Sequence, residues 1–96
     1  MQVWMTLRKK SKIIKDAMVE YDENAPFDTA ILNAMTDTLR QWDVPRPMVL
    51  SRHKADWDQF GRILFMKDHF VESFPFDVLE LEAIIERKET NIDEYV

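Results

Sequence analysis

One stretch of this sequence, residues 27–42, repeats its apolar side chains with the spacing of an α-helix. The side chains that share this face are Phe27, Ala30, Ile31, Ala34, Met35, Thr38, Leu39 and Trp42. Pro45 and Pro47 follow and cannot continue a helix, because proline lacks the backbone N–H and restricts the residue before it. The pattern predicts one amphipathic helix over residues 28–42, with Asp28 as its N-terminal cap and one face to bury.

The segment before this helix alternates in the manner of β-strands. Val3, Met5 and Leu7 share one face of a strand over residues 2–8. Residues 12–21 fit a strand or a helix equally well, and we favour a strand paired with residues 2–8 through the intervening lysines. The objection is that these lysines lack the Asn-Gly signal of a tight hairpin.

The segments after the helix predict further strands. Residues 62–66 are apolar on both faces of a strand, and residues 78–84 alternate, although residues 77–88 also carry the signals of a helix start. A short strand is expected over residues 48–50 and a short helix over residues 53–61. The predicted fold is therefore α+β, with an antiparallel sheet of about four strands packed against one main helix, and a second short helix.

The size and composition of the chain limit what it can be. Its 96 residues suffice for a single domain, expected over residues 1–86, with a polar tail at 87–96 that is expected to fray. The chain has no cysteine, which fits a reducing cytoplasm, and no apolar run long enough to span a membrane. With Gly61 as its only glycine, it cannot form a glycine-rich phosphate loop.

The two histidines offer a possible metal or acid–base site. His53 and Asp56 would share a helix face, and His69 could join them from the following strand region. The spacing lacks the HExxH pattern of a zinc enzyme. The favoured alternative is that His53 packs against Trp57 and the acids are solvated, so no catalytic residue and no cofactor is expected.

Other charged residues are also expected to be exposed. Glu80 and Glu82 share a strand face, and we expect both on the solvated side of the sheet. The basic side chains gather near the N-terminus, as Arg8, Lys9, Lys10, Lys12 and Lys15. They could contact phosphates, with Trp4 stacking on a base. However, residues 16–96 carry 18 acidic and 8 basic side chains, which disfavours a polyanionic partner.

Large apolar residues concentrate between positions 60 and 85. Phe65, Phe74 and Phe76 are the leading candidates for an interface, because one helix cannot cover both faces of strand 62–66. A purely intramolecular core is an equal alternative. The function expected is that of a small non-enzymatic cytoplasmic protein that acts through protein contacts as a homodimer. A metal-dependent or acid–base enzyme comes second, and a weak nucleic-acid binder third.

Three stretches, PRPMVLSRHKADWDQFGR, HFVES and PFDVLELEAI, together with the opening Val-Trp strand, resemble a group of small uncharacterised bacterial proteins over residues 2–84. The positions where the likeness is closest are Pro45, Pro47, His53, Phe60, Arg62, Phe70, Glu72 and Asp77. The resemblance implies a bacterial origin and supplies no catalytic residue.

Overall fold

A computed structural model describes residues 1–84 of the chain. The expected polar tail at 87–96 lies outside the described residues, as do positions 85 and 86 of the predicted domain and the end of the ambiguous segment 77–88. The described part confirms the α+β fold. Its elements in chain order are β1 (Gln2–Lys9), β2 (Lys12–Glu20), α1 (Phe27–Trp42), α2 (Ser51–Phe60), β3 (Arg62–Met66), the 3₁₀ turn η1 (Lys67–His69) and β4 (Val78–Ala83).

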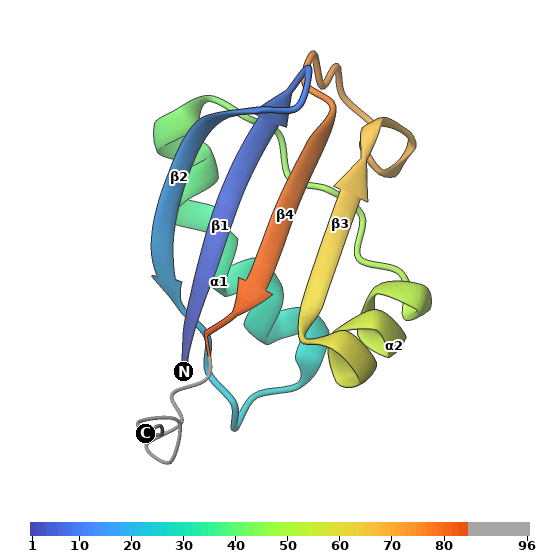
Figure 1. The fold of residues 1–96 in the computed structure, drawn as a ribbon. Coiled ribbons are helices and arrows are strands. Elements are labelled where there is room, and N and C mark those ends of the chain that lie inside the picture. Colours follow the sequence, from blue (N-terminus) through green and yellow to red (C-terminus); the bar gives the residue numbers. More distant parts are fainter. Residues whose placement is uncertain (85–96) are drawn as a thin grey trace, which may run out of the picture.

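The four strands form one antiparallel sheet in the order β2–β1–β4–β3 (Figure 1). Residues 12–20 are therefore a strand, as favoured, and residues 78–83 are a strand rather than a helix. The last strand, β4, lies between β1 and β3, so β3 is joined to the rest of the sheet only through β4. Such a non-local pairing is not visible in local periodicity.

The β1–β2 hairpin turns through two residues with positive φ, Lys10 at 53° and Ser11 at 67°. Positive φ at both central positions is the geometry of a type I′ turn, which matches the twist of the two strands. The Asp77 carboxylate supports this turn by accepting a hydrogen bond from the Lys10 N–H at 2.6 Å. The hairpin therefore forms without the usual Asn-Gly sequence.

Helix α1 buries the face that its sequence spacing predicts. Ala30, Ile31, Ala34, Met35 and Leu39 are buried, while Asp28, Asn33, Asp37 and Gln41 are exposed. The prediction that Asp28 caps the helix is wrong. The N-cap is Pro26, and the Asp28 carboxylate accepts from the adjacent Thr29 N–H instead, because the helix already begins at Phe27.

Helix α2 begins at Ser51 and ends at Phe60, and the following Gly61 caps it with a φ of 65°, the left-handed conformation that glycine adopts without strain. The strand predicted over residues 48–50 is not present. This stretch belongs to the linker between the helices, and its Met48 N–H donates a single hydrogen bond to the His69 carbonyl. Leu50 cannot extend a strand because it is the N-cap of α2.

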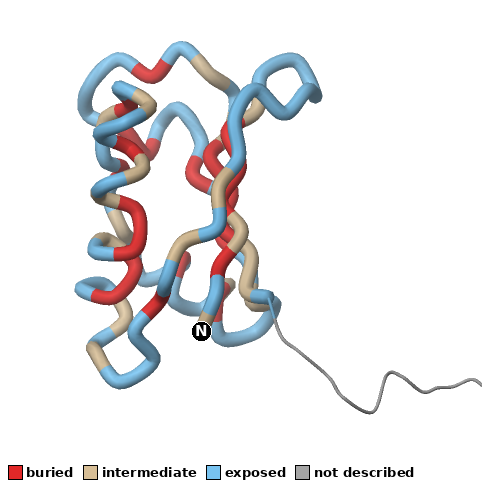
Figure 2. Tube along the Cα trace, turned by 90° about the vertical axis from the view of Figure 1, so that its left-hand side faces the viewer, coloured by how far each residue is buried: buried red, intermediate tan, exposed pale blue. Residues whose placement is uncertain are grey.

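Both helices lie on the same side of the sheet, and the buried residues lie between the two layers (Figure 2). The sheet contributes to this core from alternate positions of three strands, which are Val3, Met5, Leu7, Ile63, Phe65, Leu79 and Leu81. The opposite face of the sheet is not covered by any element within residues 1–84. In the same part of the chain, no helix is long and apolar enough to cross a membrane.

Candidate functional site

The fold brings the two histidines into contact. The rings of His53, on α2, and His69, on η1, have centroids 4.6 Å apart and are nearly perpendicular. Both side chains are buried. His53 also packs against Phe65 at 4.5 Å, whereas Trp57, its expected neighbour, packs against Tyr21 at 5.2 Å.

Asp56 does not complete a metal site with this pair. It is only partly buried, and it borders a surface depression together with Arg52 and Arg62. Among the described residues, no group of three histidine, aspartate or glutamate side chains could hold a metal ion. The structure therefore brings together two of the three candidate ligands, His53 and His69, and the enzyme alternative stays a prediction.

Each histidine binds a backbone N–H three residues before it in the chain. His53 Nδ1 accepts from the Leu50 N–H at 2.8 Å, and His69 Nδ1 accepts from the Met66 N–H at 2.9 Å. Burial, then the nearby His69 and Arg52, lower the pKa of His53 to about 4, against a smaller opposing effect of Asp56. His53 is therefore neutral at neutral pH.

The basic residues near the N-terminus do not form one continuous surface. Arg8 lies on the open face of the sheet and is paired with Glu80, while Lys15 lies opposite the buried Leu7 in the strand register. The Trp4 indole N–H donates to the Asp16 carboxylate at 3.0 Å, which places a negative charge beside the ring that was expected to stack on a base. Nucleic-acid binding stays a prediction without added support.

The three phenylalanines expected at an interface occupy different environments. Phe65 and Phe74 are buried within the single chain, so neither side chain is available to a partner. Phe74 stacks on Phe70 with ring centroids 3.9 Å apart, and the partly buried Phe76 packs on its edge at 5.6 Å. This side of strand 62–66 is intramolecular core.

The other side of the same strand belongs to the open face of the sheet. The strand register arranges this face in three rows that run across β2, β1, β4 and β3. They are Met18–Trp4–Glu82–Arg62, Asp16–Thr6–Glu80–Leu64 and Ile13–Arg8–Val78–Met66. Four apolar side chains near the two edges remain strongly exposed, with Ile13 at 50%, Met18 at 48%, Leu64 at 38% and Met66 at 43%.

The polar side chains at the centre of the open face are shielded from solvent. Glu80 is only 7% exposed, with Arg8 Nη2 at 2.6 Å from one carboxylate oxygen and Arg62 Nε at 3.7 Å from the other. Thr6 is 2% exposed, and its hydroxyl has no hydrogen-bond partner within the described residues. The expectation of a fully solvated Glu80 is therefore wrong, because long neighbouring side chains cover its carboxylate.

The residues of the open face were not identified from the sequence as a site. The apolar character of strand 62–66 on both faces was the available signal, and it indicated a second buried surface without locating it. The pairing of Arg8 with Glu80 could not be predicted from neighbouring residues, since 72 positions separate the two side chains along the chain.

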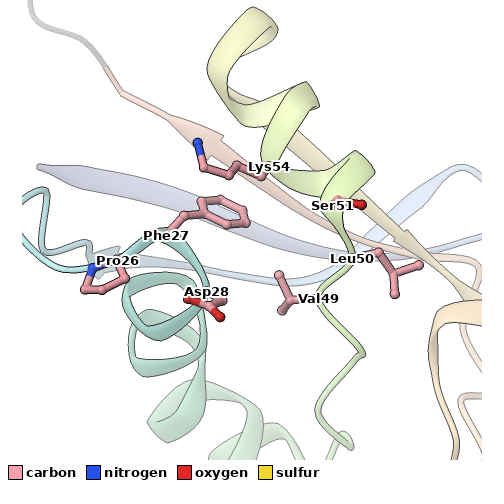
Figure 3. A pocket seen from close by; sticks show the side chains of 7 residues that line it. All are labelled: Pro26, Phe27, Asp28, Val49, Leu50, Ser51 and Lys54. Atoms are coloured by element: carbon pink, nitrogen blue, oxygen red, sulfur yellow. The ribbon is translucent and has the colours of Figure 1, made fainter.

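A second hollow lies on the helix side, between the first turns of α1 and α2 (Figure 3). Its volume is about 400 Å³, and its walls come from Pro26, Phe27, Asp28, Val49, Leu50, Ser51 and Lys54. The Lys54 amino group is already paired with Asp58 at 2.7 Å. The cavity therefore has apolar walls and few free polar groups to orient a ligand, and the open face of the sheet is the stronger candidate.

Comparison with known proteins adds no relative. No protein family, curated protein or solved structure matches the chain, so the resemblance to uncharacterised bacterial proteins stays a prediction.

Proposed function

We propose that this protein is a non-enzymatic interaction module whose open sheet face binds a second copy of the same chain. The proposal rests on one feature of this face, which no other element within residues 1–84 covers. Four of its apolar side chains are exposed near the edges, while Thr6 and Glu80 at its centre are shielded from solvent. Exposed apolar side chains gathered on one face are typical of surfaces that bind another protein.

The pattern of the face suits a partner of the same kind. A twofold axis that lies in the interface and runs along the strands between β1 and β4 would place β1 over the partner's β4 and β2 over its β3. The row Ile13–Arg8–Val78–Met66 has an apolar residue at each end, so Ile13 would meet the second copy's Met66 and the reverse. In this row the contact is apolar at both edges, whereas in the other two rows Asp16 would meet the second copy's Leu64 and Met18 would meet its Arg62.

The charges of the face also allow self-association. It carries Arg8 and Arg62 together with the acidic residues Asp16, Glu80 and Glu82, so neither sign dominates. In the arrangement above, Thr6 and Glu80, which are already buried within one chain, would lie at the centre of the contact.

The size of the face sets the strength that we expect. Four strands about 4.8 Å apart and some seven residues long span roughly 15 Å by 25 Å. This is smaller than a standard interface, which buries about 800 Å² on each partner. The dimer should therefore be reversible and depend on protein concentration. A cytoplasmic location is part of the proposal, supported by the lack of cysteine.

Sedimentation of the wild-type protein, from low micromolar to near-millimolar concentration, tests the proposal. We expect the mass to rise from one chain towards two. Met66→Asp should keep the protein monomeric at all concentrations, because it places a charge in the apolar contact. Val71→Asp is the matched control, since Val71 is 84% exposed in the loop between η1 and β4, off the sheet.

Two results would contradict the proposal. A wild-type mass of one chain throughout would exclude the second copy as the occupant of the face. A dimer that survives Met66→Asp but not Val71→Asp would place the contact elsewhere. Circular dichroism of each variant establishes that it is folded before its mass is interpreted.

A further inference from the structure

The two histidines repeat one structural device at two places in the fold. His53 holds the N-terminal turn of α2 through the Leu50 N–H, and His69 holds η1 through the Met66 N–H. In both cases the acceptor is Nδ1. A ring nitrogen that accepts a hydrogen bond carries no proton, so each neutral ring carries its single proton on Nε2.

Protonation of either ring would therefore break the bond that it makes. The second proton of an imidazolium binds at Nδ1, where it would point at a backbone N–H that is itself a donor. The backbone group would lose its acceptor, and a positive charge would be buried next to the other ring. At His53, which is buried and whose Nδ1 accepts the Leu50 N–H, the neutral ring is the form that fits.

The surroundings of the pair give little compensation for a positive charge. On α2, Arg52 opposes protonation of His53 and Asp56 favours it weakly. On η1, Asp68 Oδ1 lies 3.9 Å from His69 Nε2 and is strongly exposed. From β3 the neighbour is the Phe65 ring, and the linker presents the Met48 N–H to the His69 carbonyl. The Nε2 of His53 is buried without a hydrogen-bond partner in residues 1–84.

We propose that His53 and His69 form an acid-sensitive latch, which at neutral pH holds the linker, the start of α2 and η1 together and on acidification releases them from the sheet. The three segments are already joined, because the Met48 N–H binds the carbonyl of the same residue whose ring caps η1. Release at one histidine therefore weakens the attachment of all three.

The direction of the pH effect follows from linkage. His53 has a pKa of about 4 in the folded protein and an ordinary value near 6.5 once released, so the open form binds more protons between these two values. The latch is closed most firmly above about pH 6.5, and it loses stability as the pH falls towards about 4. For one histidine with these values, opening becomes favoured by roughly twentyfold between pH 7 and pH 5.

Hydrogen exchange measured residue by residue tests the latch, with rates corrected for the intrinsic effect of pH. In the wild type, protection of the Leu50 amide should fall at least tenfold from about pH 7 to pH 5, and protection of the Met66 amide should fall with it because the Met48–His69 hydrogen bond joins the two segments. Protection of the Met5 amide, in the central strand β1, should stay constant. A fall of equal size at all three amides would mean global unfolding and would overturn the proposal.

The double variant His53→Gln with His69→Gln is the matched control. Glutamine at the third position of a helical turn offers a carbonyl oxygen to the same N–H and does not titrate. Its protection at Leu50 and Met66 should therefore not change between these pH values. The same acid-induced loss in this variant would show that the histidines are not responsible.

A second measurement uses only the wild-type protein, so it does not depend on the variant folding. Ring chemical shifts of His53, followed by NMR during a pH titration, should report protonation well below pH 6.5 and together with the change in the Leu50 amide. Protonation near pH 6.5 with no change in that amide would overturn the latch.

Discussion

Arg8 Nη2 lies 2.6 Å from Glu80 Oε1 on the open side of the sheet, between neighbouring strands β1 and β4. Glu80 is nearly buried there, whereas the Arg8 side chain is one-third exposed. A charge pair in this position helps only while both partners are present, because either charge alone would be left partly desolvated. The pair therefore holds the centre of the face in one arrangement.

The first prediction concerns this pair. Arg8→Ala should lower the free energy of unfolding by about 1–3 kcal/mol, because Glu80 loses its closest cation. Arg62→Ala should cost less than about 1 kcal/mol, since Arg62 is farther from the carboxylate and mostly exposed. Urea unfolding at neutral pH measures both. An equal loss of unfolding free energy in the two variants would show that the short Arg8–Glu80 contact does not stabilise the fold more than the longer Arg62–Glu80 contact.

The second prediction concerns Phe74, which the structure places in the core. Phe74→Ala should lower the free energy of unfolding by about 3 kcal/mol, because it removes a buried ring stacked on Phe70. Phe60→Ala, at a mostly exposed position of α2, should stay within about 0.5 kcal/mol. If Phe74→Ala changed only the oligomeric mass and left stability unaltered, Phe74 would belong to an interface after all.

The third prediction concerns the β1–β2 turn. Replacing Lys10-Ser11 by Asn-Gly should raise the free energy of unfolding by about 0.5–1 kcal/mol, because both positions have positive φ, which these residues adopt more easily. The hydrogen bond from the backbone of residue 10 to Asp77 is retained. Lys10→Ala is the control and should not stabilise. A less stable Asn-Gly variant would argue against the type I′ geometry.

The fourth prediction concerns the two faces of α1. Ile31→Ala and Leu39→Ala should each cost about 2–5 kcal/mol, the range for large-to-small changes in a packed core. Asn33→Ala, on the exposed face, should stay within about 0.5 kcal/mol. Denaturation midpoints that did not separate the two classes would contradict the orientation of the helix.

Much of the fold could be predicted from local patterns because those patterns report on burial. The face of α1 follows from a spacing of three and four residues, and the buried faces of β1 and β4 follow from alternation. The wrong predictions concern residues whose local pattern is compatible with two different structures. Met48-Val49-Leu50 has the composition of a strand, yet Leu50 is required as the N-cap of α2. Asp28 is a good cap, but the helix begins one residue before it.

The candidate site was harder to predict because its members come from distant parts of the chain. The sequence indicated that strand 62–66 needs cover on both sides, and it identified both histidines as unusual. It did not show that Phe65 faces the helices while Leu64 and Met66 face the open side of the sheet. Both faces of this strand are apolar, so its residue pattern does not tell which face the helices cover.

Local periodicity identifies the main helix and strand segments, apart from residues 48–50 and η1, because helix and strand spacing are properties of neighbouring residues. Which of these elements pack against one another is visible only in the folded domain. The insertion of β4 between β1 and β3 brings Glu80 between Arg8 and Arg62, and the return of η1 to α2 brings His69 onto His53. These contacts depend on the order of strands in the sheet, which the balance of packing over the whole domain selects.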